Sequence, residues 1–286
     1  MMMVSPDTHS DGQALPERAT YRTVFISDTH LGSRAARSRD LAAFLEQMHC
    51  EKLYLVGDII DFWRLGNKPY WPPCHHRVLR RILKLVQQGT QVIFVPGNHD
   101  EAARRYCGMD LGGVQVMRED THETVDGRRM LVVHGDEYDL IVNSSRLLNI
   151  IGGTCYEWLV TMNRHYNNVR VRLGLPHRHF SRYIKSKVKS ACKYVSDFES
   201  ALELEAKNRG VDGIVCGHIH KPEMRESAEP QYYNCGDWIE HCTALTEDEL
   251  GQFQLVRYNC ERTRARAADN RPAIEPVTAE LAASLV

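Results

Sequence analysis

The sequence predicts an α/β fold in which parallel strands alternate with helices. Three short apolar runs, at 23–26, 53–56 and 92–95, each stop at a polar residue, a glycine or a proline, as buried strands do. Between them, apolar residues at 41–48 and 78–86 recur every three or four positions, as on one face of a helix. Strand–helix crossovers of this kind place consecutive strands parallel in one sheet.

The pattern changes in the second part of the chain. Three short strands are expected at 114–117, 121–125 and 130–133, and Asp126-Gly127 between the last two is typical of a hairpin turn. From about 139 to 208 the pattern is helical, and strand character returns at 213–216, 231–234 and 253–256. We therefore expect one domain at 20–258 with a helical insertion at about 139–208, between a disordered N-terminal tail (1–19) and a mostly disordered C-terminal tail (259–286).

Composition excludes several classes of protein. With 43% hydrophobic residues over 286 positions the chain can build a core, and its net charge of −1 argues against a uniformly basic nucleic-acid binder. Nine cysteines without a CxxC pair do not form the even, clustered set of a secreted disulfide framework. Residues 1–19 lack the apolar segment of a signal peptide, and no run of about 18 apolar residues could span a membrane. We expect a cytoplasmic protein.

Polar side chains that bind metals follow the predicted strands where the strands end. In α/β sheets ligands bind at the carboxyl ends of strands, so these side chains are expected to share one cleft. Taken singly, a histidine after a strand is more often a capping residue, and a Gly-Asp pair is usually a turn. Those roles do not explain five such clusters in series. The clusters are Asp28–His30, Gly57–Asp61, Gly97–Asp100, His134–Asp136 and Gly217–His220.

The donor atoms in these clusters indicate a pair of divalent cations. Carboxylates and imidazoles without thiolates suit Mn, Fe, Mg or Zn, and do not fit a structural zinc site made of cysteines. Asp28 and His30, like His218 and His220, are separated by one residue, so in extended chain both side chains point to the same side. Seven candidate ligands exceed what one catalytic ion needs. Two ions that share a carboxylate lie about 3.5–4 Å apart, a spacing suited to phosphoryl transfer.

The order of the five clusters resembles the calcineurin-like metallophosphoesterases. Their motifs Asp-x-His, Gly-Asp-x-x-Asp, Gly-Asn-His-Asp, His-Gly-Asp and Gly-His-x-His all occur here in the family's order, between residues 24 and 237. The resemblance implies a four-layer αββα sandwich of two mixed sheets with a dinuclear metal site at the strand ends. It also implies that the first metal is held by Asp28, His30 and His220, and the second by Asn98, His134 and His218, with Asp58 bridging both.

The same resemblance implies the reaction. We expect the two ions to be Mn²⁺, with Fe, Zn and Mg as alternatives that the same ligands tolerate. A hydroxide between the two ions would attack phosphorus in line, its pKa lowered by both cations. His99 would lie beside the leaving oxygen or an equatorial one, and Asp61 would accept a hydrogen bond from His99 and raise its basicity. We expect Asp100 and Asp136 to support turns or neighbouring ligands, and Asp237 to lie beside the site rather than in it.

Within the family, the segments Gly57–Trp63 and His134–Asp136 are similar to the UDP-2,3-diacylglucosamine pyrophosphatases. Those enzymes cleave the pyrophosphate of a lipid-loaded sugar nucleotide and release UMP and diacylglucosamine 1-phosphate on the route to lipid A. The established branch of that group carries Arg where this chain has His99, so the resemblance implies a related branch. Another phosphomonoester, phosphodiester or nucleotide substrate is an alternative. A non-catalytic scaffold is a further one, against which every expected metal ligand is present.

The helical insertion carries a strong positive charge. Between residues 158 and 196 there is no Asp or Glu but nine Lys and Arg, interleaved with aromatic and apolar residues. One interpretation is a lid that binds substrate phosphates, or binds peripherally to the anionic inner face of the plasma membrane. A solvated helical face, a dimer contact or a nucleic-acid backbone are alternatives, although no recognisable motif supports the last. The residues expected to bind substrate are Arg170, Arg172, Arg178, Lys185 and Lys189.

Overall fold

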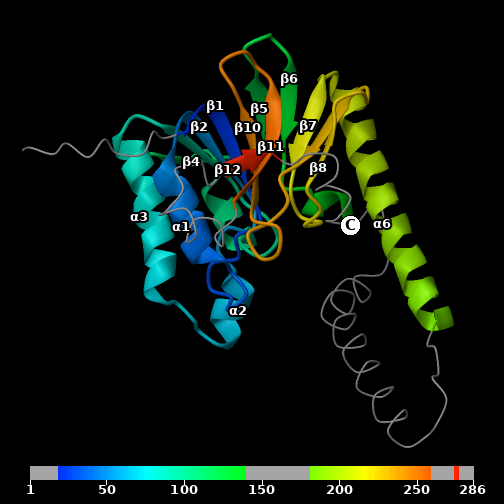
Figure 1. The fold of residues 1–286 in the computed structure, drawn as a ribbon, viewed down its shortest axis with the longest axis horizontal. Coiled ribbons are helices and arrows are strands. Elements are labelled where there is room, and N and C mark those ends of the chain that lie inside the picture. The colour runs from blue at the N-terminus through cyan, green and yellow to red at the C-terminus, as the bar shows by residue number, and fades with distance from the viewer. Residues whose placement is uncertain (1–18, 140–180, 259–273, 277–286) are drawn as a thin grey trace, which may run out of the picture.

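The computed structural model describes residues 19–139, 181–258 and 274–276. In the helix at 181–209, side chains are described from Lys193 onward. Two sheets face one another and helices cover the outer face of each, so the layers run helix, sheet, sheet, helix (Figure 1). This arrangement confirms the predicted αββα sandwich of two mixed sheets. Over these described ranges, no helix is long and apolar enough to cross a membrane.

The first sheet has seven strands in the order β12-β11-β10-β1-β2-β3-β4. Strands β1 to β4 run parallel, as the alternation of strands and helices predicts, and β10, β11 and β12 add antiparallel strands on the other side of β1. The bounds are β1 (Ala19–Ile26), β2 (Met48–Val56), β3 (Gln91–Val95), β4 (Val114–Val116), β10 (Thr243–Glu247), β11 (Phe253–Tyr258) and β12 (Ile274–Pro276).

The second sheet has five strands in the order β5-β6-β7-β9-β8. Its centre, β6, β7 and β9, is parallel, and the two edge strands are antiparallel to their neighbours. The bounds are β5 (Asp120–Glu123), β6 (Arg129–Val132), β7 (Gly213–Cys216), β8 (Glu223–Arg225) and β9 (Gln231–Asn234). The carboxyl ends of β6 and β7 therefore lie side by side, as do those of β1, β2 and β3 in the first sheet.

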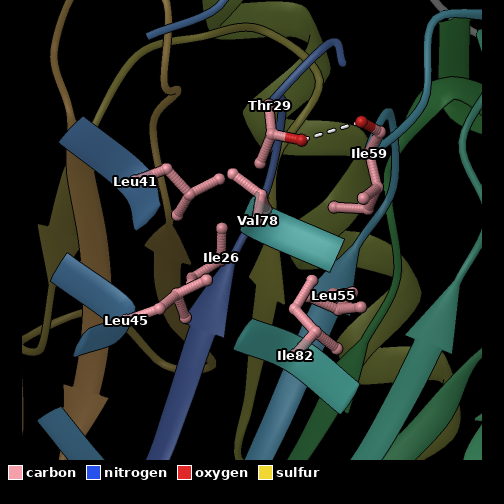
Figure 2. A pocket seen from close by; sticks show the side chains of 8 residues that line it. All are labelled: Ile26, Thr29, Leu41, Leu45, Leu55, Ile59, Val78 and Ile82. Carbon is pink, nitrogen blue, oxygen red and sulfur yellow. Dashed lines mark hydrogen bonds between the residues drawn. The ribbon is translucent and has the colours of Figure 1, made fainter. Parts of the chain in front are cut away.

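Helices α1 (Ser38–Gln47) and α3 (Pro73–Gln87) cover the outer face of the first sheet. Leu41 and Leu45 are one turn apart on α1, and Val78 and Ile82 are one turn apart on α3; all four are buried. Figure 2 shows these side chains closing over β1 and β2. Burying each such side chain contributes about 1.5–3 kcal/mol, so this packing holds in place the strands whose ends carry the first clusters.

The space between the two sheets is filled by large apolar side chains. Phe25 of β1 and Tyr54 of β2 stack with ring centroids 4.9 Å apart and face Val132 of β6 and Val215 of β7, all fully buried. Parallel strands buried on both faces are apolar at nearly every position, which is why their sequences appear as continuous apolar runs. This core fixes one sheet relative to the other, and with it the two sets of strand ends.

Helix α6 (Ser181–Arg209) forms the outer layer over the second sheet, on the right in Figure 1. Phe198, Leu202 and Ala206 recur at one face of α6, are fully buried, and pack against Ile214 of β7 and Tyr232 of β9. The last part of the predicted insertion at 139–208 is therefore a layer of the sandwich. Residues 140–180 of that insertion lie outside the described residues.

Three short helical segments connect the strands to their neighbours, and each begins at the end of a predicted site cluster. They are α2 (Phe62–Asn67), η1 (Glu101–Tyr106) and η2 (Asp136–Tyr138).

Candidate metal centre

All five predicted clusters lie at the carboxyl ends of strands. Asp28 follows β1, Asp58 follows β2, Asn98 follows β3, His134 follows β6 and His218 follows β7. The first three ends belong to one sheet and the last two to the other, so the site lies where the two sheets meet. Hydrogen bonds between the loops hold them in register.

One of these bonds is visible in Figure 2. The Thr29 hydroxyl, between two predicted ligands, donates to the carbonyl oxygen of Ile59 at 2.8 Å. The backbone N–H of His30 also donates, at 2.9 Å, to the carbonyl oxygen of Asp58. The loops after β1 and β2 are therefore tied together by backbone and side chain at the position of the ligands.

The backbone is unusual at the predicted ligands themselves. Six non-glycine residues in the described part of the chain have positive φ, and five are predicted ligands: Asp28, His30, Asp58, His218 and His220. Their φ values lie between 45° and 71°, a region that costs a side chain about 1–3 kcal/mol and persists only where the surroundings impose it. Such strain concentrates at functional sites, so these loops are shaped to present side chains rather than to minimise local energy.

The predicted ligands of the first metal converge. His220 Nε2 lies 3.2 Å and His30 Nε2 lies 3.7 Å from the same oxygen, Asp28 Oδ1, and the three donor atoms lie within 4.8 Å of one another. Both Asp28 Oδ1 and His30 Nε2 are buried without a hydrogen-bond partner among the described residues. Buried polar atoms without partners are rare in folded proteins, and a divalent cation would satisfy these two together.

Asp58 lies between the two sets of predicted ligands. Its Oδ2 is 3.7 Å from His30 Nε2 and 3.5 Å from His134 Nε2. Burial would raise the pKa of Asp58, but the charges of His134 and His30 lower it to about 2. The low pKa favours the ionised carboxylate, and its Oδ2 has an imidazole nitrogen from each sheet within 3.7 Å, as a bridging ligand would.

His134 is a second histidine in contact with Asp58, and Asn98 offers a buried side-chain oxygen. His134 Nδ1 contacts the carbonyl oxygen of Val56 at 3.0 Å, which leaves Nε2 directed at Asp58. His134 Nε2 and Asn98 Oδ1 are further buried atoms without a partner among the described residues. The side chain of His218 lies against His134, with ring centroids 5.1 Å apart, but its Nε2 contacts Asp139 Oδ2 at 2.8 Å.

The carboxylates of the site raise the pKa of two histidines beside Asp58. Burial would lower the pKa of His30, but Asp28, Asp61 and Asp58 raise it to about 10. Burial acts in the same way on His134, yet Asp58 and Asp28 raise its pKa well above the usual value. This concentration of negative charge favours positive ions, and their binding would release protons from the two histidines.

His99 lies at the open side of the site. Its Nδ1 is 3.1 Å from Asp61 Oδ1, and Trp63 packs against the ring with centroids 4.1 Å apart. Asp61 also lies 3.4 Å from His30 Nδ1 and accepts a hydrogen bond from the backbone of Arg64, so its carboxylate is fixed from several directions. His99 is therefore oriented by Asp61 on one side and by an aromatic face on the other, with 24% of its side chain exposed.

Gly57 explains part of the motif around Asp58. Its φ is +75°, and a Cβ at this position would lie 2.2 Å from His134 Nδ1. Only glycine can both adopt that conformation without strain and let the imidazole approach the backbone so closely. A glycine is therefore needed at position 57 for the His134 side chain to occupy its place in the site.

Two of the three remaining acidic residues take supporting places. Asp136 makes two bonds to Arg104, at 2.7 and 2.8 Å. Asp237 is fully buried, accepts hydrogen bonds from the backbone of Ile239 and Glu240 at 2.6 Å, and contacts the ring of His241. Neither is in a group of converging donor atoms among the described residues.

Asp139 is a site residue that sequence reasoning missed. It touches the predicted ligand His218 and accepts a hydrogen bond from the hydroxyl of Tyr194 on α6. Burial would raise the pKa of Asp139, but these two partners lower it. No motif marks this position, because it follows His134 by five residues in a segment with a helical pattern.

The predicted substrate-binding residues of the insertion are not located by the structure. Arg170, Arg172 and Arg178 lie outside the described residues. Lys185 and Lys189 lie on the first half of α6, where side chains are not described.

Curated relatives include two proteins named UDP-2,3-diacylglucosamine hydrolase. The protein of Aliivibrio fischeri is 27% identical over 232 residues, covering 78% of this chain and 92% of the relative. That of Porphyromonas gingivalis is 28% identical over 244 residues, covering 76% and 90%. Among solved structures, Vps29 of Entamoeba histolytica complexed with zinc is 14% identical with a TM-score of 0.43, covering 89% of this chain and 97% of that one. A likeness of that size adds nothing to the assignment.

The family model described as calcineurin-like phosphoesterase matches residues 21–222, well over half of the chain. The family implies bound divalent metal ions, and four buried donor atoms without partners, on Asp28, His30, Asn98 and His134, fit them. The chain belongs to the calcineurin-like phosphoesterase family and is a metal-dependent phosphoesterase.

Proposed function

We propose that this enzyme hydrolyses the pyrophosphate bond of UDP-2,3-diacylglucosamine, or of a similar lipid sugar nucleotide, to UMP and diacylglucosamine 1-phosphate. The observation that carries the catalytic part is the position of Asp58, whose Oδ2 lies within 3.7 Å of His30 Nε2 from the first sheet and within 3.5 Å of His134 Nε2 from the second. The substrate rests on the relatives named for it, which the chain matches over at least 90% of their length in the two cases given above.

Two divalent cations would supply the chemistry of the site by lowering the pKa of water and by neutralising charge on the phosphate. Asp28, His30 and His220 would hold the first and Asn98, His134 and His218 the second, with Asp58 shared. We propose Mn²⁺ as the native ion, because carboxylate, amide and imidazole ligands without thiolate suit it; Fe, Zn and Mg are compatible with the same donors.

His99 and Asp61 would act on the substrate side of the centre. His99 is partly exposed and lies 4.0 Å through Nε2 from Asp58 Oδ2, so this nitrogen faces the place where a phosphate group would bind. Because Asp61 engages Nδ1, Nε2 is the nitrogen free to hydrogen-bond a phosphate oxygen. His99 would stabilise charge on the leaving or an equatorial oxygen, or donate a proton to it, and Asp61 would keep the ring in the orientation this needs.

The basic insertion would supply binding energy at a distance from the metals. Arg170, Arg172, Arg178, Lys185 and Lys189 would bind phosphate oxygens that the metals leave free, and the interleaved apolar residues would lie against acyl chains. The same charge would hold the enzyme peripherally at the anionic inner face of the plasma membrane, on the cytoplasmic side. Such a location would bring the site to a lipid-linked substrate.

The test is release of UMP from UDP-2,3-diacylglucosamine in the presence of Mn²⁺, beside a small chromogenic phosphodiester. We expect turnover of the lipid substrate to be far more efficient, and Asp58→Ala to abolish the metal-stimulated hydrolysis of both. Reversing the charges of Arg170, Arg172 and Arg178 should reduce lipid turnover more than turnover of the small ester. Hydrolysis of the small ester alone would contradict the lipid substrate but leave the phosphoesterase class intact.

A further inference from the structure

Asp139 links the ligand set to the helix that covers the second sheet. It stands directly after η2, and its two carboxylate oxygens have different partners. Oδ2 lies 2.8 Å from His218 Nε2, and Oδ1 accepts the hydroxyl of Tyr194, which comes from α6, 55 positions along the chain. Asp139 and His218 are both largely shielded, with 24% and 12% of their side chains exposed.

The ring of His218 is enclosed on its other sides. It lies against His134 at 5.1 Å and against Phe198 of α6 at 5.9 Å between ring centroids. Its backbone N–H donates to Asp28 Oδ2 at 2.9 Å, so main chain and ring are both held. With the plane of the ring confined in this way, the remaining freedom is which of its two nitrogens faces the metal centre.

The carboxylate of Asp139 removes that freedom. An ionised carboxylate accepts hydrogen bonds only, so Nε2 must carry the proton, and Nδ1 is then the unprotonated nitrogen. Histidines that bind metals commonly donate their other N–H to a carboxylate, which fixes the tautomer and the orientation of the ring. We propose that Asp139 is a positioning residue that holds His218 with Nδ1 directed to the second metal, and that Tyr194 holds Asp139 in turn.

This inference rests on the proposed metal centre, and deepens it by naming a residue that no family motif marks. Tyr194 occupies Oδ1, so Oδ2 remains for the imidazole. Since Tyr194 belongs to α6, the position of that helix and the orientation of a metal ligand are mechanically connected. The connection runs through two hydrogen bonds and the contact of Phe198 with the same ring.

The test is Mn²⁺ binding to the full-length, metal-free protein and its variants, followed by calorimetric titration and by electron paramagnetic resonance. The resonance distinguishes a single Mn²⁺ from a spin-coupled pair, so it reports the second ion without reference to activity. We expect Asp139→Ala to weaken the second Mn²⁺ by about 10–100-fold, the usual cost of losing such a partner, and to leave the first ion's affinity within a few-fold. The signal of the coupled pair should disappear at Mn²⁺ concentrations that saturate the wild-type protein.

Conservative variants separate positioning from other roles. Asp139→Asn keeps an oxygen that can accept from Nε2, and should recover most of the lost affinity for the second ion. Tyr194→Phe removes only the hydroxyl and should produce a smaller loss at the second site than Asp139→Ala. Glu137→Gln is the matched control, because Glu137 is a carboxylate two residues away that pairs with Arg118 at the surface and should leave both affinities unchanged.

Three results would overturn the inference. The first is a second Mn²⁺ that binds Asp139→Ala as tightly as the wild type. The second is Asp139→Asn losing as much affinity as Asp139→Ala, which would make Asp139 a direct ligand. The third is loss of both ions in a variant whose circular dichroism and urea midpoint match the wild type. Failure of the proposed metal centre would look different, since the wild-type protein would then bind fewer than two ions, and failure of the proposed substrate would leave all these metal titrations unchanged.

Discussion

Asp100 offers the sharpest test of how the loops of the site are held. It is fully buried, and its carboxylate accepts backbone N–H groups from two separate loops: Gly97 at 2.6 Å, Ile59 at 2.7 Å, Ile60 at 3.2 Å and Asp58 at 3.3 Å. Hydrogen bonds to charged groups contribute about 1.5–3 kcal/mol each, so counting only the two short ones, Asp100→Ala should lower the free energy of unfolding by about 3–6 kcal/mol. The variant also leaves buried N–H groups without partners.

The measurement is urea unfolding of the metal-free protein, followed by far-ultraviolet circular dichroism. Asp100→Asn keeps one of the two accepting oxygens, so it should lower the free energy of unfolding by less than Asp100→Ala. It replaces Asp100→Ala in the measurement if that variant does not fold. The control is Glu137→Ala, which removes an exposed carboxylate that pairs with Arg118 at the surface and should cost about 1 kcal/mol or less. A loss in Asp100→Ala no larger than in this control would refute the view that Asp100 joins the two loops.

Three further perturbations test other parts of the structure. Gly57→Ala should displace His134, because its Cβ would lie 2.2 Å from Nδ1, and calorimetric titration should show weakened Mn²⁺ binding; unchanged binding would contradict the steric role. Phe198→Ala should lower the free energy of unfolding by about 3–5 kcal/mol in urea, since the ring is fully buried under α6; a loss below 1 kcal/mol would disprove the packing. Burial would raise the pKa of Glu247, but contacts with His122 and Arg22 lower it. The stability that ionised Glu247 contributes is therefore present above pH 4.5 and is lost as the pH falls through the lowered pKa of the folded protein. Glu247→Gln should make the free energy of unfolding fall less steeply at acid pH, and a fall as steep as in the wild type would contradict this role of Glu247.

Most of the sandwich could be predicted from the sequence because its central strands are buried on both faces. The strands at 213–216 and 231–234 were predicted with the bounds that the structure has. Strand β10 was missed since Thr243, Thr246 and Glu247 interrupt its apolar pattern, although every one of its residues is buried. Glu247 is tolerated there because His122 and Arg22, from β5 and β1, lie 2.8 and 2.9 Å away, and no local pattern reveals partners so distant in sequence.

The site could be predicted to the extent that it lies in motifs at strand ends. Asp28, Asp58 and His134 each lie within two residues of the end of an apolar run, so the end of the strand marks them. Asp139 contacts its partner across 79 positions and stands in a segment with a helical pattern, so only the assembled structure reveals it. The role of α6 is hidden for a similar reason: its helical pattern is continuous, and only packing shows that Phe198 belongs to the sandwich.

The most direct test of the central claim is the number of divalent ions that bind per chain, together with the hydrolysis that depends on them. Metal-free protein titrated with Mn²⁺ should take up two equivalents, and phosphodiester hydrolysis should rise with the second and disappear on chelation. Asp58→Ala should hold fewer than two ions and show no metal-stimulated hydrolysis, because this carboxylate lies between His30 of the first sheet and His134 of the second. Two ions and near-normal hydrolysis in Asp58→Ala would contradict the account.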